Sequence, residues 1–144
     1  MTPFTAEQSA FIQAQRVGRL ATTDALGQPH VVPVCYAHAE QSFYIALDAK
    51  PKRVAPEQLK RVRNIRANPL AALVIDHYSE DWRSLAYLLV QGESVLLPVG
   101  DAEQQHAVTL LRIRYPQYHE MPIQEHPVIA LRAASVVAWG AIQA

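Results

Sequence analysis

Short apolar stretches, either alternating or continuous, recur along the chain and predict β-strands. Six strands are predicted, over residues 19–23, 30–37, 43–48, 70–76, 85–97 and 128–139. Pro33 cannot donate a ladder hydrogen bond, so its strand must lie at a sheet edge or bulge there. Gly92 predicts a bend or bulge within the long fifth strand. Gly27 lies in a hairpin connection, where it is free to adopt a positive φ.

Helical signals are inserted between these strands without a regular alternation. The predicted helices span residues 5–16, 56–68 and 101–114. Thr5 and Gln8 have capping-box spacing, and Asp101 and Gln104 repeat it. Pro56 suits the first position of the middle helix. Six strands with peripheral helices predict a mainly β (α+β) fold, a small antiparallel barrel in which closure removes the sheet edges.

Length and composition predict one globular domain over residues 1–144. The chain has a mass of 16.0 kDa, 50% hydrophobic residues and 18% charged residues, which disfavours disorder. A formal net charge of +0 argues against a dedicated nucleic-acid binder. Cys35 is the single cysteine, so no intramolecular disulfide is expected.

The sequence also predicts that the protein does not span a membrane. No apolar run approaches the ~20 residues that a transmembrane helix needs. The start, Met1-Thr2-Pro3-Phe4, lacks the basic and apolar regions of a signal peptide. We therefore expect a cytoplasmic protein with no membrane partner.

Basic residues are concentrated between residues 48 and 66. This segment holds seven of the 13 lysines and arginines but only two acidic residues, Asp48 and Glu57. The seven are Lys50, Lys52, Arg53, Lys60, Arg61, Arg63 and Arg66. Cations that leave a strand just before a helix N-terminus are suited to hold phosphate. We interpret Lys50-Pro51-Lys52-Arg53 as an anion site, whereas Arg63 and Arg66 fit a solvated helix face.

The order of these segments resembles that of a known family. A Val-Val-Pro-Val strand, an aromatic strand, the basic segment and Arg61-x-x-Asn64-Ile65-x-x-Asn68-Pro69 follow one another. This order is similar to that of the pyridoxamine 5′-phosphate oxidase-like flavin-binding split-barrel family. The closer match is to its short deazaflavin-dependent oxidoreductase branch. The resemblance covers most of residues 17–97, together with the closing strand at 132–140.

This resemblance implies a six-stranded antiparallel split β-barrel of the FMN-binding type. It further implies a homodimer that binds a flavin or deazaflavin at the subunit interface. The resemblance assigns Val32, Pro33 and Val34 to the ring of the cofactor. It assigns Lys50, Lys52, Arg53 and Arg61, with Lys60 beside them, to the phosphate. Ala49 and Pro51 stand where many members have Ser or Thr, so hydroxyl contacts to the phosphate are missing from this loop. The extra segments of true pyridoxamine phosphate oxidases are also missing.

Aromatic residues could form a wall beside a planar redox ring. Trp82, Tyr78 and Tyr87 surround the connection between the fourth and fifth strands, and Trp139 lies near the C-terminus. Such side chains stack on flat rings and exclude water from a transferred hydride. Core packing is the alternative for Tyr87 and Trp139. We assign Trp82, Tyr87 and Trp139 to the cofactor site.

Candidates for acid–base catalysis are few. His77 and Tyr78 could supply a proton at a strand end, although a structural hydrogen bond explains Asp76-His77 as well. The histidines have no regular metal-ligand spacing, so no metal site is expected. Cys35 has no neighbouring base in the sequence and is interpreted as an inert buried thiol.

The favoured hypothesis is an oxidoreductase that transfers a hydride between a bound flavin-type cofactor and a small organic acceptor. The cofactor is FMN or the deazaflavin coenzyme F420, and the clustered basic residues favour the more anionic deazaflavin. The alternative is a flavin- or haem-binding carrier of the same fold, with an axial ligand from the histidines at 119–126. A nucleic-acid module that uses the basic segment is a third hypothesis, which the neutral net charge disfavours.

Overall fold

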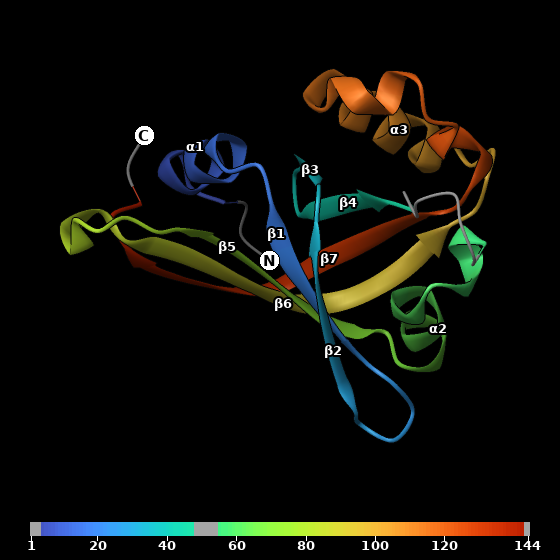
Figure 1. Cartoon of the computed structure of the whole chain (residues 1–144), viewed down its shortest axis with the longest axis horizontal. Helices are drawn as coiled ribbons and strands as arrows, with labels where there is room; N and C mark the ends of the chain where they lie inside the picture. The colour runs from blue at the N-terminus through green and yellow to red at the C-terminus, as the bar shows by residue number, and fades with distance from the viewer. Residues whose placement is uncertain (1–3, 48–54, 143–144) are drawn as a thin grey trace.

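A single antiparallel sheet curls into a half-barrel in the computed structural model, which describes residues 4–47 and 55–142 (Figure 1). The seven strands in this part of the chain are hydrogen-bonded in the order β2-β1-β5-β6-β7-β4-β3. They are β1 (Gly18–Thr23), β2 (Pro29–Val34), β3 (Ala37–Ala39), β4 (Ser42–Ala46), β5 (Leu70–His77), β6 (Ala86–Leu97) and β7 (Val128–Gly140). The split-barrel prediction is confirmed, but the sheet does not close on itself, so the predicted removal of its edges is wrong: β2 and β3 remain edge strands.

The strand count differs from the predicted six. Residues 30–37 were predicted as one strand, but the chain leaves β2 after Val34 and pairs again only from Ala37. There the short strand β3 forms a hairpin with β4, closed by the turn residues Glu40 and Gln41. Glu40 has a φ of 55°, a value that bulky residues rarely adopt. The extra strand therefore depends on a turn without the usual glycine signal.

Three α-helices and four short 3₁₀ helices complete the described residues. They are α1 (Ala6–Ala14), η1 (Pro56–Gln58), α2 (Lys60–Ala67), η2 (Trp82–Ser84), α3 (Ala102–Arg114), η3 (Pro116–His119) and η4 (Ile123–Glu125). The predicted capping box of Thr5 and Gln8 is confirmed. At α3, Asp101 caps the helix as expected, but the Gln104 amide oxygen accepts from the Gly100 N–H instead of from Asp101.

Two backbone predictions about the sheet are confirmed. The strand that contains Pro33, β2, is an edge of the sheet, which is a position where a strand proline is tolerated. The pairing of β6 with β7 shifts register between Gln91 and Gly92, which is a β-bulge. A Cβ on Gly92 would lie 1.8 Å from the Arg132 carbonyl oxygen, so only glycine fits there.

Two apolar clusters stabilise the fold, one on each side of β4. Every residue of β4 is buried. Phe43 and Ile45 belong to the cluster inside the curled sheet, whereas Tyr44 and Ala46 belong to the cluster under α3. This alternation follows from the opposite faces of successive strand residues. α3 therefore covers the outer side of β4, as Figure 1 shows.

Candidate functional site

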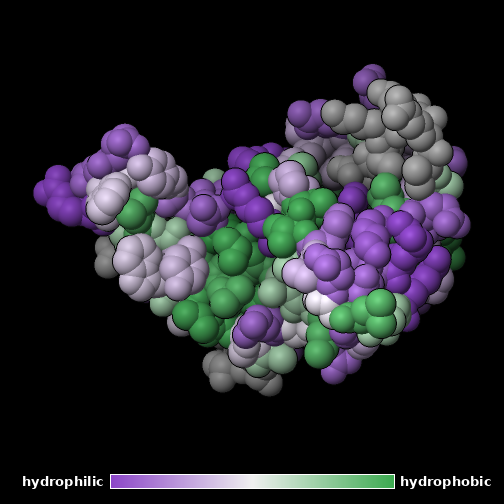
Figure 2. Space-filling view, turned by 60° about the horizontal axis from the view of Figure 1, so that its bottom comes forward, coloured by the Kyte–Doolittle hydropathy of each residue, from purple (hydrophilic) through white to green (hydrophobic). Residues whose placement is uncertain are grey.

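The outer face of the sheet carries an apolar surface that no other element covers among the described residues. Cross-strand register places Pro33, Arg19, Val74, Leu89 and Val137 in one row. Residues in register share a face of the sheet. Pro33 is exposed and Val137 is 48% exposed. Figure 2 shows an apolar area bordered by polar side chains on this side of the molecule.

Two further rows flank the first and combine apolar side chains with a few polar ones. Val31 is 60% exposed and lies in the row of Ala21 and Ala72. In the row on the other side, Tyr87 lies opposite Trp139. The apolar outer face, as we call these three rows, thus runs from the edge strand β2 to the end of β7. Exposed apolar surface of this kind marks an interaction site.

The strand that is expected to hold the flavin ring presents its two faces differently. Val34 is buried and Val32 packs partly against the inner cluster, whereas Pro33 faces outward. The side chains of Val32 and Val34 are therefore committed to the core. What β2 offers to a ligand is the backbone along its free edge and the ring of Pro33. This arrangement suits ring contacts made by backbone atoms.

The basic residues fall into separate groups. Lys50, Lys52 and Arg53 lie outside the described residues. Lys60 places its ammonium 3.8 Å from the Asp24 carboxylate in the β1–β2 turn, and Arg61 follows it on the first turn of α2.

Arg63 and Arg66, at the other end of the basic segment, turn back onto the chain before α2. The Arg63 Nε donates to the Gln58 carbonyl oxygen at 3.2 Å. An Arg66 N–H donates to the backbone carbonyl oxygen of Glu57 at 3.5 Å. Both side chains are exposed. This position agrees with the interpretation of Arg63 and Arg66 as a solvated helix face.

The aromatic candidates are divided between two places. Tyr87 and Trp139 stack on each other with ring centroids 5.8 Å apart, and Trp139 is 52% exposed. Trp82 lies at the tip of the β5–β6 hairpin and is 72% exposed. None of the three belongs to either apolar cluster. Their positions leave all three available for contact with a ligand or a second protein chain.

The strand end at Asp76 and His77 is arranged differently from the predicted pair. The Asp76 carboxylate accepts from an Arg19 N–H at 2.6 Å across the sheet, on the outer face. His77 instead lines a groove of about 350 Å³ with Phe11, Ala14 and Ser84. The Tyr78 hydroxyl donates to the Glu80 carboxylate at 2.5 Å. His77 is therefore better placed than Tyr78 to reach a ligand.

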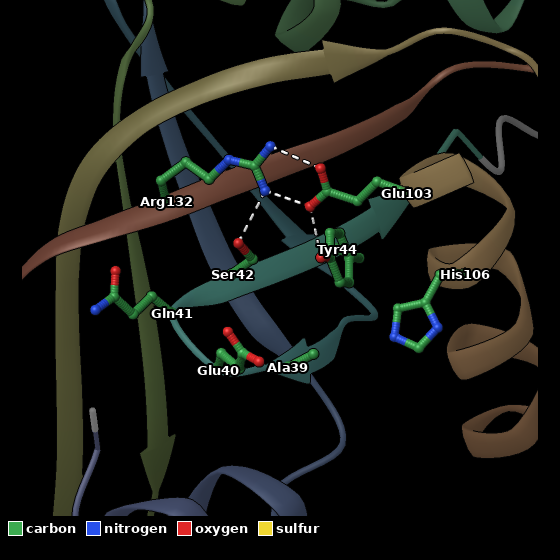
Figure 3. Close-up of a pocket in the computed structure, with 8 residues that line it drawn as sticks. All are labelled: Ala39, Glu40, Gln41, Ser42, Tyr44, Glu103, His106 and Arg132. Atoms are coloured by element: carbon green, nitrogen blue, oxygen red, sulfur yellow. Dashed lines mark hydrogen bonds and ion pairs between the residues drawn. The ribbon is translucent and has the colours of Figure 1, made fainter. Parts of the chain in front are cut away.

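A polar pocket of about 510 Å³ lies between β4, β7 and α3 (Figure 3). Arg132 reaches the Glu103 carboxylate with both terminal nitrogens, one of them at 2.9 Å, and also donates to the Ser42 hydroxyl at 2.9 Å. The Tyr44 hydroxyl donates to the same carboxylate at 2.7 Å. The charge of Arg132 is thus paired with a carboxylate of the same pocket, at a partly exposed position. Sequence reasoning missed this pocket because Glu103 of α3 meets Arg132 of β7 only when the helix packs against the sheet.

The Glu103 carboxylate has a strongly perturbed acidity. The hydrogen bonds from Arg132, and then the one from Tyr44, lower its pKa to about 2 from an ordinary 4.5. A depressed pKa stabilises the fold above pH 4.5, and this contribution disappears as the pH falls through about 2.

We therefore expect Glu103→Gln to lower the free energy of unfolding at pH 7 by about 1 kcal/mol, since the pair is partly exposed and screened. The difference from wild type should shrink below pH 4.5 and vanish near pH 2. Urea unfolding across this pH range measures it. Glu93→Gln, a change at an exposed carboxylate on β6, is the control. A constant difference at every pH would contradict the assignment.

The described residues form neither a cluster of metal ligands nor a membrane-spanning helix. Nowhere in residues 4–47 and 55–142 do three or more His, Cys, Asp or Glu side chains converge as metal ligands. In the same residues, no helix combines the length and apolarity that crossing a membrane requires.

The sequence of this chain matches a known family model and is similar to a known reductase. The family model described as pyridoxamine 5′-phosphate oxidase matches residues 4–142. The chain is 28% identical over 139 residues to the 5a,11a-dehydrotetracycline/5a,11a-dehydrooxytetracycline reductase of Streptomyces rimosus. The aligned region covers 96% of this chain and 84% of the reductase.

Two solved structures have similar folds. An FAD-binding protein of Mesorhizobium loti is 26% identical, has a TM-score of 0.68 and covers 95% of each chain. The haem storage protein HutZ of Vibrio cholerae has a TM-score of 0.72 at 14% identity, over 96% of this chain and 98% of HutZ.

Proposed function

Because this chain belongs to the pyridoxamine 5′-phosphate oxidase family, we propose that it is an oxidoreductase that transfers a hydride between a bound flavin-type cofactor and a small organic acceptor. The family match over residues 4–142 carries the proposal. The similarity to a reductase and to an FAD-binding protein supports it. The cofactor is FMN or the deazaflavin coenzyme F420.

The residues of the described chain fit such a cofactor in two respects. The free edge of β2 presents backbone groups and the Pro33 ring to a flat ligand. Lys60 and Arg61, at the start of α2, add cations for a phosphate. Lys50, Lys52 and Arg53 extend this basic set in the sequence. These five cations favour the deazaflavin, whose tail carries several negative charges.

The roles of the cofactor and of the protein follow from this fit. When bound, the cofactor supplies the hydride chemistry, and the protein supplies binding, orientation and exclusion of water. The β2 edge orients the ring, and the cations of the basic segment hold the phosphate. Where the acceptor needs a proton, His77 is the candidate, because its ring lines a groove beside Phe11 and Ser84. No obligatory acid or base in the protein is required.

We also propose that the protein is a homodimer that joins through the apolar outer face. The face extends from Pro33 to Val137 and is interrupted by the Arg19–Asp76 ion pair, and a copy of the same surface would cover it. The stacked Tyr87 and Trp139 lie at one end of this surface. In a dimer these rings would reach the partner and help to form the cofactor site.

Placing a charge in this face tests the dimer. We expect Val137→Asp to weaken self-association on the order of 100-fold, because a buried carboxylate would be left unpaired. Analytical ultracentrifugation measures the change. Ile113→Asp, at an apolar residue of α3 that is 74% exposed, should leave the mass unchanged. A monomeric wild-type protein would contradict the proposal.

The second candidate function is a haem carrier, which the fold similarity to HutZ favours. The two histidines at the expected position already contact protein groups. His119 Nε2 lies 2.7 Å from the Arg112 carbonyl oxygen, and His126 Nδ1 lies 3.3 Å from a Glu57 carboxylate oxygen. His126 thus keeps Nε2 for a ligand, whereas the Nε2 of His119 is engaged.

Titration of the purified protein separates these functions. FMN, F420 and haemin are added in turn, and absorbance and fluorescence are recorded. Saturable binding of F420 or FMN, followed by hydride transfer to an added acceptor, is the expected result. A Soret band with no flavin or deazaflavin binding would replace the oxidoreductase with the haem carrier. Binding of none of them would overturn both.

A further inference from the structure

The irregular segment before β7 is attached firmly to α3. Gln104 is 1% exposed, and its amide nitrogen donates to the carbonyl oxygens of Gln124 and His126 at 3.2 and 3.1 Å. Arg112 donates to the carbonyl oxygens of Tyr118 and Met121 at 3.0 and 2.9 Å. A buried amide with all its partners fixes the backbone it contacts. The position of His126 is therefore set by α3.

His126 uses this fixed position to contact the chain just before α2. Its Nδ1 lies 3.3 Å from a carboxylate oxygen of Glu57 in η1. Because a carboxylate only accepts, Nδ1 carries the proton in this contact. The two side chains are 25% and 35% exposed, so the pair is partly shielded from water. The contact joins residues that are 69 positions apart in the sequence.

Glu57 lies in the basic segment, where its carboxylate could affect the binding of an anion. It is one of only two acidic residues between residues 48 and 66, among seven basic ones. Lys60 and Arg61, the first residues of α2, follow it three and four positions later. A carboxylate that is free to move can pair with such cations and compete with a phosphate for them. Its partner therefore affects the charge that an anionic ligand meets.

We propose that His126 is a positioning residue for the two cations at the start of α2, Lys60 and Arg61, where an anionic ligand would bind: it holds the Glu57 carboxylate and fixes η1 against the start of this helix. The proposal rests on the proposed function only in that the natural anion is the cofactor phosphate. His126 itself does not touch the ligand.

The charges around Glu57 agree with this role. The hydrogen bond from His126 is the largest cause that lowers the pKa of Glu57 below its ordinary value, and Arg66 adds a smaller electrostatic effect. The Arg66 guanidinium also donates to the Glu57 carbonyl oxygen at 3.5 Å. Arg66 therefore holds the backbone of Glu57, whereas His126 holds its side chain.

Replacing His126 by alanine tests the proposal without any cofactor. We expect the pKa of Glu57, followed by side-chain NMR, to rise toward the ordinary value when the hydrogen bond is lost. His119→Ala is the matched control, because His119 lies in the same segment and contacts Arg112 instead of Glu57. An unchanged Glu57 titration in His126→Ala would overturn the proposal.

Affinity supplies the second readout. Inorganic pyrophosphate, and whichever of FMN or F420 binds the wild type, should bind about five-fold more weakly to His126→Ala. His126→Gln, which can donate to Glu57, should restore much of the loss, and so should His126→Ala combined with Glu57→Gln. Unchanged pyrophosphate affinity would overturn the positioning role. Wild-type protein that binds pyrophosphate but no flavin-type cofactor would overturn the proposed function instead.

Discussion

Replacing Gly92 by alanine is expected to lower the free energy of unfolding by about 3 kcal/mol or more, which corresponds to roughly 10 °C in Tm. The cause is steric. An added Cβ would lie 1.8 Å from the Arg132 carbonyl oxygen and 3.1 Å from the Ala134 nitrogen. Both are backbone atoms of β7, so no side-chain rotation relieves the clash. Thermal unfolding followed by circular dichroism measures the loss.

The control for this change is Gly100→Ala. Gly100 has a φ of 90° and no atom within 4 Å of an added Cβ, so only its backbone conformation resists the substitution. We expect a loss of about 1 kcal/mol there. Equal losses in the two variants would show that close approach at the bulge is not what makes Gly92 necessary.

Replacing Lys50, Lys52 and Arg53 together by alanine is expected to weaken cofactor binding on the order of 100-fold, since charge-assisted contacts to phosphate are lost. We expect thermal stability to change little, as is typical of substitutions of surface charges. Fluorescence titration with F420 and FMN measures the affinity. The loss should be smaller at high salt, where the wild-type attraction is itself screened.

The matched control is Arg83→Ala, which removes an exposed cation from the tip of the β5–β6 hairpin. Its cofactor affinity should equal that of wild type, although one positive charge is lost. Unchanged affinity in the triple variant would place the phosphate elsewhere. A similar loss in Arg83→Ala would indicate an effect of net charge alone.

Local features of this fold could be predicted from the sequence because single residues determine them. Pro33 required an edge or a bulge and Gly92 a bend or a bulge, and the structure has an edge strand at Pro33 and a bulge at Gly92. The capping box of Thr5 and Gln8 depends only on spacing along the chain. In each case the cause lies within a few residues of its effect, so no knowledge of the tertiary structure is needed.

Features that depend on register could not be predicted in this way. Asp76 pairs with Arg19, which is 57 residues away, and not with its neighbour His77, because successive strand residues face opposite sides. The pairing of β4 with β7 aligns Arg132 with Ser42, and Arg132 meets Glu103 only once α3 also packs against these strands. The residues assigned to the cofactor site remain predictions; the structure shows that Tyr87 and Trp139 stack together and that Trp82 lies apart from them.

Both faces of β4 are buried, and this limits which insertions and deletions the sequence can accept during evolution. Inserting or deleting one residue there would exchange the side chains that face the two clusters, moving Tyr44 toward the space of Phe43. Neither the barrel interior nor the space under α3 could absorb the exchange alone. By contrast, Leu26, at the tip of the β1–β2 turn, is 95% exposed. Length changes among descendants of this gene should therefore accumulate at that turn, while β4 keeps a constant length.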